Sequence, residues 1–172
     1  MEAVTGLIGA GKSYYCNKLR KMEFRVLDCD EIVKELYVKD KALRNRLINE
    51  LGLTKSNDTI DLNELADLIF TNPEAKHKLE QLVYPVLEGY LIAKQPEVVE
   101  VSNLIGSKFL LDLFDTITIV DAPEDVRLKR LIEIRHMSDE DAKRRIEAQR
   151  FPEGTTWNDL FPGKNINFKF GV

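Results

Sequence analysis

The chain has 172 residues, of which 44% are hydrophobic and 31% are charged, a composition typical of a single globular domain. Its formal net charge of −4 argues against a nucleic-acid partner, since nucleic-acid-binding surfaces carry excess basic charge. No apolar run approaches the roughly 20 residues that span a bilayer, no signal-peptide pattern is present, and two cysteines make no disulfide framework, so a cytoplasmic location is expected.

The first predicted elements are a short buried strand at residues 3–5 and a helix at residues 13–19, joined by a glycine-rich loop. Residues 6–13 read G-L-I-G-A-G-K-S and match G-x-x-x-x-G-K-[S/T], the phosphate-binding loop of nucleotide triphosphatases and kinases. In this pattern backbone N–H groups surround the phosphates, the lysine reaches the β- and γ-phosphates, and the hydroxyl binds Mg²⁺. The residues predicted to bind the phosphates of ATP are Gly9, Ala10, Gly11, Lys12, Ser13 and Tyr14. Ser13 is also the predicted Mg²⁺ ligand.

A second strand is predicted at residues 24–27, and Asp28 and Asp30 follow it directly. Ligands of a parallel sheet gather beyond the carboxyl ends of its strands, so both acids are expected near the same crevice as the loop. Only one of the two side chains is expected to face the substrate. That carboxylate would accept a proton from an attacking hydroxyl or hold Mg²⁺ through water. The alternative is that both acids cap the next helix.

The segment from about residue 39 to residue 91 is predicted to be mostly helical and to form an insertion that binds the phosphoryl acceptor. Helices are expected at residues 31–37, 42–51 and 62–70. Asn72-Pro73 pairs a cap residue with proline at the first helical position, which predicts a helix from there to residue 93. Pro85 lies inside this helix, where a kink or a break is expected.

Further strands are predicted at residues 98–101, 116–120 and 165–170, and the stretch from 151 to 164 is predicted to be a loop. Strands that alternate with helices indicate an α/β fold, a parallel sheet of about five strands flanked by helices. Two helices, from residue 121 to about 135 and from residue 138 to about 150, would form a lid over the nucleotide.

The predicted lid is rich in basic residues: Arg127, Lys129, Arg130, Arg135, Arg144, Arg145 and Arg150. Arginines that close over a transferring phosphoryl group lower the barrier to transfer. Acids are interleaved with them, and a salt-bridged helical pair accounts for most of these charges. One to three of the arginines are therefore expected to contact the nucleotide.

Several segments together resemble the dephospho-CoA kinase family. They are T-G-L-I-G-A-G-K-S at 5–13, V-L-D-C-D-E-I at 26–32, L-E-Q-L-V-Y-P-V-L at 79–87, T-I-T-I-V at 116–120, R-L-K-R at 127–130 and R-I-E-A-Q at 145–149. The resemblance implies a P-loop kinase fold and transfer of the γ-phosphoryl group of ATP to the ribose 3′-hydroxyl of dephospho-CoA. By position it implies that Asp30 is the acid beside the attacking hydroxyl and that Arg130 is a lid arginine. Lys12 and Ser13 match the phosphate and Mg²⁺ residues, and Tyr84 and Pro85 match the acceptor segment.

Two segments depart from the pattern of that family. Tyr84 stands where the family usually has histidine, and residues 100–106 read E-V-S-N-L-I-G where the family usually has Asp-x-Pro-Leu-Leu-Phe-Glu. Related nucleoside and deoxynucleoside monophosphate kinases share the same architecture and form an alternative. A nucleotide-binding protein that has lost phosphoryl transfer is a second alternative.

Overall fold

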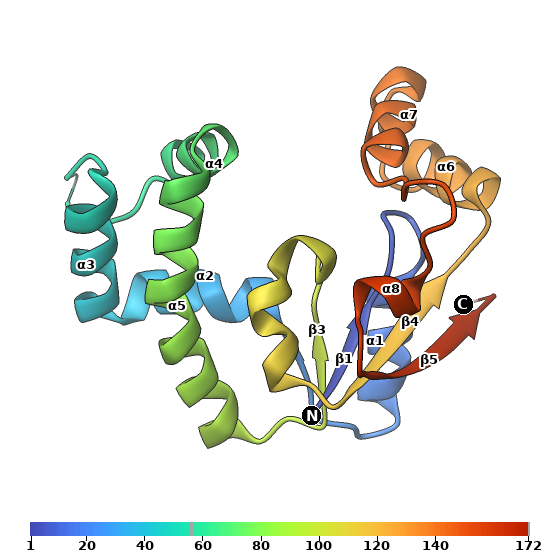
Figure 1. The fold of residues 1–172 in the computed structure, drawn as a ribbon, viewed down its shortest axis with the longest axis horizontal. Helices are drawn as coiled ribbons and strands as arrows, with labels where there is room; N and C mark the ends of the chain where they lie inside the picture. The colour runs from blue at the N-terminus through green and yellow to red at the C-terminus, as the bar shows by residue number, and fades with distance from the viewer. Residues whose placement is uncertain (56, 172) are drawn as a thin grey trace. The chain divides into compact units, whose positions relative to one another are not determined.

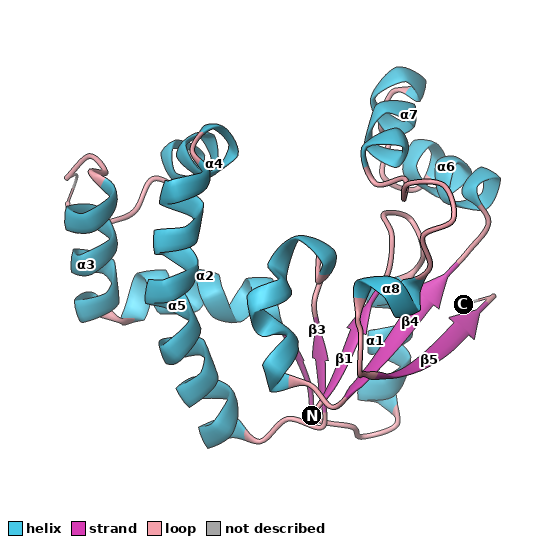
Figure 2. Cartoon of the chain, viewed as in Figure 1, coloured by secondary structure: helices cyan, strands magenta, loops and turns pink. Residues whose placement is uncertain are grey.

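The structure, a computed structural model, describes residues 1–55 and 57–171 (Figure 1). Its contacts divide the chain into two compact units, one made of Met1–Asp28 with Pro96–Val172 and the other of Cys29–Gln95. The first unit holds the sheet and its flanking helices, and the second unit is helical (Figure 2). None of the helices in the described part of the chain is long and apolar enough to cross a membrane.

Within the described residues of the first unit, five parallel strands form one sheet in the order β2-β3-β1-β4-β5. They are β1 (Glu2–Thr5), β2 (Val26–Asp28), β3 (Val98–Glu100), β4 (Thr116–Asp121) and β5 (Asn165–Phe170). The central strand β1 is buried from Ala3 to Thr5, as expected for a strand with neighbours on both edges and cover on both faces. The predicted α/β fold with a parallel sheet is confirmed.

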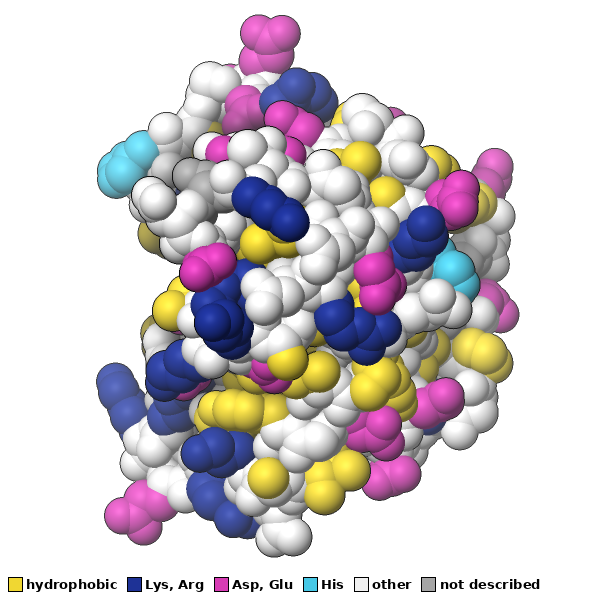
Figure 3. All heavy atoms as spheres, turned by 90° about the vertical axis from the view of Figure 1, so that its left-hand side faces the viewer, with side chains coloured by type: hydrophobic (Ala, Val, Ile, Leu, Met, Phe, Trp, Pro, Cys, Tyr) yellow, Lys and Arg dark blue, Asp and Glu magenta, His cyan; other side chains and the backbone are white. Residues whose placement is uncertain are grey.

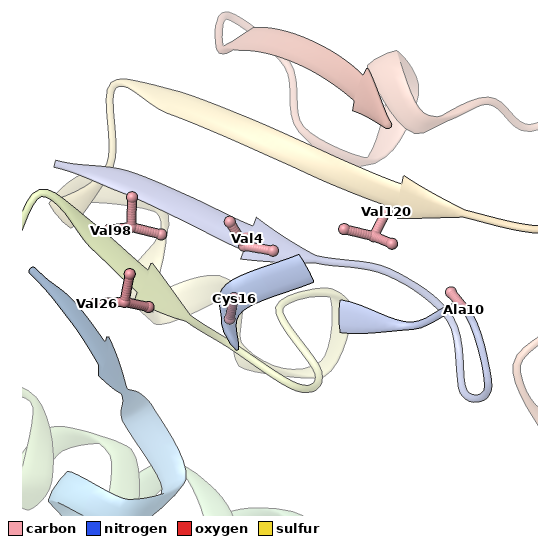
Figure 4. Close-up of a cluster of buried hydrophobic side chains, with 6 residues drawn as sticks. All are labelled: Val4, Ala10, Cys16, Val26, Val98 and Val120. Atoms are coloured by element: carbon pink, nitrogen blue, oxygen red, sulfur yellow. The ribbon is translucent and has the colours of Figure 1, made fainter. Parts of the chain in front are cut away.

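The described helices of the first unit are α1 (Lys12–Lys21), the 3₁₀ segment η1 (Ile105–Leu113), α6 (Glu124–Glu133), α7 (Asp139–Ala148) and the short α8 (Trp157–Leu160). Helix α1 packs on the sheet through Cys16, which is fully buried against side chains from four strands (Figure 4). These are Val4, Val26, Val98 and Val120, with Ala10 of the loop beside them. This core fixes the position at which α1 begins, directly after the glycine-rich loop. Cys16 and Cys29, the two cysteines of the described chain, are buried and form no disulfide.

The prediction of a loop from 151 to 164 was wrong, because α8 lies inside it. Thr156 and Asp159 form a capping box at its start, and the ring of Trp157 packs edge-on against Phe151 at 4.9 Å. A cap and aromatic contacts thus stabilise a helix of four residues, which hydrophobic periodicity cannot reveal.

The second unit contains α2 (Cys29–Lys39), α3 (Lys41–Leu51), α4 (Leu62–Thr71) and α5 (Pro73–Lys94). As predicted, Asn72 caps α5, and its side chain accepts a hydrogen bond from the backbone N–H of Ala75. Of the kink or break expected at Pro85, the break does not occur, since α5 continues as one helix through it. Proline removes one backbone hydrogen bond, while the buried side chains of Leu82, Leu87 and others keep both halves of α5 packed.

Figure 3 shows acidic and basic side chains interspersed on the face that it draws.

Candidate active site

The glycine-rich loop joins the end of β1 to the start of α1, the strand–loop–helix order that the motif predicts. Gly6 and Gly9 have φ angles of 154° and 79°. A Cβ atom on Gly6 would lie 2.2 Å from the carbonyl oxygen of Val120, and one on Gly9 would lie 2.8 Å from that of Arg127. Only glycine therefore lets the loop run this close to β4 and α6.

Lys12 points its ammonium group back into the loop. Its Nζ donates to the carbonyl oxygens of Gly6, at 3.0 Å, and Leu7, at 3.1 Å. Burial, followed by the charge of Arg135, lowers the pKa of Lys12 to about 8, and the carboxylate of Glu100 opposes this shift. A phosphate anion near Nζ would favour the ammonium form, so this lysine gains charge stabilisation when an anion binds.

Ser13 lies in the first turn of α1 and contacts a buried acid from the neighbouring strand β3. Its Oγ donates to the carboxylate of Glu100 at 2.7 Å, and Glu100 is 3% exposed. The guanidinium of Arg20 lies 4.0 Å from the other oxygen of this carboxylate. Burial, then Glu100, raises the pKa of the Cys16 thiol to about 12, and this thiol is also hydrogen-bonded to Glu100. The group brings one hydroxyl and one carboxylate together, both of them oxygen donors of the kind that Mg²⁺ prefers.

A cavity of about 480 Å³ opens beside the loop, and two arginines of the predicted lid line it together with residues of the loop and α1. Its lining residues are Gly9, Gly11, Lys12, Ser13, Tyr14, Arg130, Ile134 and Arg135. Arg130 donates from Nη1 to the carbonyl oxygens of Gly9, at 3.2 Å, and Ala10, at 2.9 Å. The structure thus brings Arg130 and Arg135 to the loop residues predicted to bind phosphate.

The remaining predicted lid cations have other surroundings. Arg127 is buried and donates from Nε to the carbonyl oxygen of Ala122. Arg144 and Arg145 both pair with Asp141, and Arg150 pairs with Glu124, while Lys129 is exposed. The salt-bridged pair of helices, the alternative that the sequence left open, therefore describes these outer arginines.

The two acids after β2 lie in different elements. Asp28 is the last residue of β2, half-buried, and in register with Glu100 of β3. Asp30 is exposed in the first turn of α2, because the chain already becomes helical at Cys29. The expectation of a near-extended chain through both acids was therefore wrong. A carboxylate in the first turn of a helix interacts favourably with the helix dipole, and Asp30 occupies such a position.

The residues predicted to bind the acceptor belong to the helical second unit. Asp30 lies in α2, and Tyr84 and Pro85 lie in the middle of α5. Tyr84 is half-buried and Pro85 is exposed. The residues predicted to bind phosphate, by contrast, all belong to the first unit.

Two residues of the site were not assigned a role from the sequence. In the sequence, Glu100 stands out only as a departure from a family pattern. An acid at the end of a strand beside β1 could nevertheless have indicated a site residue. Gln149 ended one of the segments quoted above, and its side chain accepts a hydrogen bond from the backbone N–H of Ile8 at 2.7 Å. Nothing in the local sequence predicts that contact, because it joins residues 141 positions apart.

Comparisons with known proteins identify the family of this chain. The dephospho-CoA kinase family model matches residues 2–156. A dephospho-CoA kinase from Coxiella burnetii is 30% identical over 161 residues, covering 85% of this chain and 77% of the relative. One from Corynebacterium jeikeium is 28% identical over 159 residues, covering 85% and 80%.

Solved structures share the fold. The crystal structure of TT1252 from Thermus thermophilus superposes with a TM-score of 0.73 and 25% identity, covering 99% of this chain and 88% of that one. Dephospho-CoA kinase from Campylobacter jejuni superposes with a TM-score of 0.62 and 21% identity, covering 99% and 88%. Because the family model spans most of the chain, this protein belongs to the dephospho-CoA kinase family, a family of ATP-dependent phosphotransferases.

Proposed function

We propose that this protein transfers the γ-phosphoryl group of ATP to the 3′-hydroxyl of dephospho-CoA, giving CoA and ADP, and that it does so in the cytoplasm. The observation that supports the proposal best is the cavity in which the phosphate loop, Lys12 and Arg130 meet. Relatives that match over 85% of the chain carry the name dephospho-CoA kinase, which supports the choice of acceptor.

In this proposal the phosphates of ATP bind to the loop and the first turn of α1. The backbone N–H groups of Gly9, Ala10, Gly11, Lys12, Ser13 and Tyr14 surround the β- and γ-phosphates, at the amino end of a helix that attracts anions. The Lys12 ammonium and the Arg130 guanidinium stabilise the charge that spreads over the γ-phosphoryl oxygens during transfer. Both groups now donate to loop carbonyls, so they lie beside the phosphate position before the nucleotide arrives.

The residues around Ser13 fit a magnesium ion. The hydroxyl of Ser13 and the buried carboxylate of Glu100 are oxygen ligands, and no group of three or more His, Cys, Asp or Glu side chains in the described chain could hold a metal by itself. Mg²⁺ is commonly held by one or two protein oxygens together with substrate phosphates and water, and it neutralises phosphate charge when bound. We assign Ser13 as the direct ligand. Glu100 and Asp28, which are in register on adjacent strands, would hold its waters.

The acceptor, in this proposal, binds to the helical insertion at residues 39–91 of a single kinase domain, and residues 123–150 act as the lid. Asp30 accepts the proton of the 3′-hydroxyl while the oxygen of that hydroxyl forms a bond to the γ-phosphorus. The bond from the γ-phosphorus to the β,γ-bridging oxygen breaks, and ADP leaves. Tyr84 and Pro85 contact the acceptor. Asp30 offers an exposed carboxyl group in the first turn of α2 for this role.

An acceptor panel tests the proposal. The protein is incubated with ATP and Mg²⁺ and with dephospho-CoA, the common nucleoside monophosphates or the deoxynucleoside monophosphates, and ADP release is followed. Mass spectrometry and ³¹P NMR then identify the phosphorylated position of the product. Turnover with dephospho-CoA and a 3′-phosphate product is expected. Turnover only with a monophosphate, or ATP binding without any turnover, would overturn the assigned acceptor.

A further inference from the structure

Ile8 is the point at which the phosphate loop is attached to the pair of helices α6 and α7. Its side chain packs against their buried cluster of Leu131, Ala142 and Ile146. Its carbonyl oxygen accepts a hydrogen bond from Nη1 of Arg127 at 3.4 Å. Its backbone N–H donates to Oε1 of Gln149 at 2.7 Å. Side chain, carbonyl and amide of one loop residue are therefore all held by the same two helices and their ends.

Gln149 makes the shortest of these polar contacts from the end of α7. It is the C-cap residue of that helix, its own N–H is bonded to the last turn, and its side chain is half-buried. The carboxamide must present its oxygen to Ile8, since the partner group is an N–H donor. A side chain without an acceptor at this position would leave the part-buried N–H of Ile8 without this partner.

The residues that follow Ile8 are those assigned to phosphate binding. Gly9 comes next and packs so tightly on Arg127 that a Cβ would lie 2.8 Å from its carbonyl oxygen. Gly11, with a φ angle of 102°, caps α1 and turns the chain into the helix. A displacement of Ile8 therefore alters the direction of the N–H groups only a few residues further along.

We infer that Gln149 is a positioning residue that holds the phosphate loop in its phosphate-binding conformation. It ties the loop to the helices that carry Arg130 and Arg135, so that the loop amides and these arginines keep a fixed spacing around the cavity. The inference rests on the proposed function only for the identity of the ligand, ATP. It predicts that loss of the Gln149 oxygen lowers nucleotide affinity by lowering the fraction of molecules with a competent loop.

Three variants isolate this contact. Gln149→Met keeps the length and bulk of the side chain and removes the strong acceptor. Gln149→Glu keeps an oxygen acceptor, and Gln149→Asn retracts the carboxamide by one methylene and serves if the methionine variant does not fold. Lys143→Met is the matched control, because Lys143 is an exposed residue of α7 that pairs with Asp139.

Amide hydrogen exchange of Gly9, Gly11, Lys12 and Ser13 is measured by NMR without nucleotide, and Mg·ATP affinity is measured by calorimetry well below the melting temperature. Gln149→Met, or Gln149→Asn, is expected to speed exchange of these amides and to weaken Mg·ATP binding by up to about tenfold. Gln149→Glu is expected to keep the slow exchange of the wild type. Lys143→Met is expected to match the wild type in both measurements.

A lower melting temperature with wild-type exchange and wild-type affinity would mean that the bond is merely structural, and the inference would be wrong. Fast exchange in the Gln149→Glu variant would also overturn it, because the acceptor is then not what holds the loop. The exchange measurement uses no nucleotide. A wild-type protein that binds no ATP would therefore contradict the proposed function, while loop exchange would still decide the role of Gln149.

Discussion

Ser13 and Glu100 are joined by a hydrogen bond of 2.7 Å between a helix-terminal hydroxyl and a carboxylate that is 3% exposed. The two residues lie 87 positions apart and meet because β1, which leads into the loop, pairs with β3, which ends at Glu100. A buried carboxylate needs compensation, and here a hydroxyl, a thiol and the nearby Arg20 guanidinium supply it. The pair gives the phosphate loop a negative partner aimed at the position assigned to Mg²⁺.

Replacement of Glu100 by glutamine should weaken magnesium binding, because the amide keeps the shape of the side chain and loses the charge. Outer partners of metal sites typically contribute about 10- to 100-fold to metal affinity or activity, and we expect a loss in that range. A Mg²⁺ titration of turnover at saturating ATP measures it. Glu97→Gln is the control, since Glu97 precedes β3 and its partly exposed side chain pairs with Arg25. Equal magnesium dependence of both variants would contradict the role of Glu100.

Replacement of Lys12 by alanine should weaken ATP binding. A charge-assisted contact to phosphate is worth on the order of 1.5–3 kcal/mol, which is the expected loss. Calorimetry with Mg·ATP gives the number, and Lys21→Ala, at the far end of α1, is the control. An alanine variant that binds ATP as tightly as the wild type would exclude Lys12 from the phosphate site.

The lowered pKa of Lys12 predicts that ATP binding takes up a proton. With a pKa of about 8, roughly half of the free protein carries neutral Lys12 at pH 8, and a bound phosphate favours the ammonium. The expected uptake is therefore about half a proton per ATP at that pH, falling toward zero at about pH 6.5, where the group is already protonated. Affinity should decline as pH rises above this pKa. Calorimetry in buffers of different ionisation enthalpy measures the uptake. In Lys12→Arg the side chain at position 12 stays charged, so it should take up no proton when ATP binds.

Asparagine at position 30 should slow turnover strongly and leave ATP affinity unchanged. A positioned base contributes about 10²–10⁴-fold, and we expect a loss of about 10²- to 10³-fold because positioning and charge stabilisation carry much of phosphoryl transfer. Asp28→Asn is the comparison, and it should reduce the rate less, since Asp28 lies at the end of β2 rather than in the first turn of α2. Both rates must be measured at saturating ATP. A nearly inactive Asp28 variant beside an active Asp30 variant would reverse the two roles.

Alanine at Gly6 should destabilise the fold. Its Cβ would approach the carbonyl oxygen of Val120 to 2.2 Å, and the φ angle of 154° is itself unfavourable for alanine. Overpacking and backbone strain of this kind cost about 1–3 kcal/mol each, so the melting temperature should fall clearly. Gly89→Ala is the control, because a Cβ there meets nothing within 4 Å and the position is inside α5. That change should stabilise the helix by about 0.5–1 kcal/mol.

Elements with a local chemical signature could be predicted from the sequence. The loop motif predicted the turn between β1 and α1, and Asn72-Pro73 predicted the start of α5. The strand expected at residues 165–170 is β5. The boundary after β2 was wrong because nothing local marks where an extended chain becomes helical, and α2 begins at Cys29 rather than after Asp30. The 3₁₀ segment η1 was not predicted either.

The residues of the candidate site also fall into those that a sequence pattern predicts and those that it does not. Lys12 and Ser13 could be proposed because their spacing matches a phosphate-binding pattern, and Arg130 because its position matches a lid arginine of the family that the chain resembles. The structure brings all three to one cavity. Glu100 and Gln149 acquire their roles from partners 87 and 141 positions away. Only strand order and helix packing create such contacts. A strand order of β2-β3-β1-β4-β5 leaves no periodic trace in the sequence.

The central position of β1 has a consequence for how the chain folds as it is synthesised. Its two neighbours in the sheet are β3 and β4, whose residues 98–100 and 116–121 are made much later, whereas α2 to α5 of the helical unit contact one another within residues 29–95. At translation rates of about 5–20 residues per second, the helical unit has all its partners about 1–5 s before β1 has its own. The glycine-rich loop is thus made before the strands that flank β1, so the nascent chain carries its nucleotide site unformed until β3 and β4 have been made.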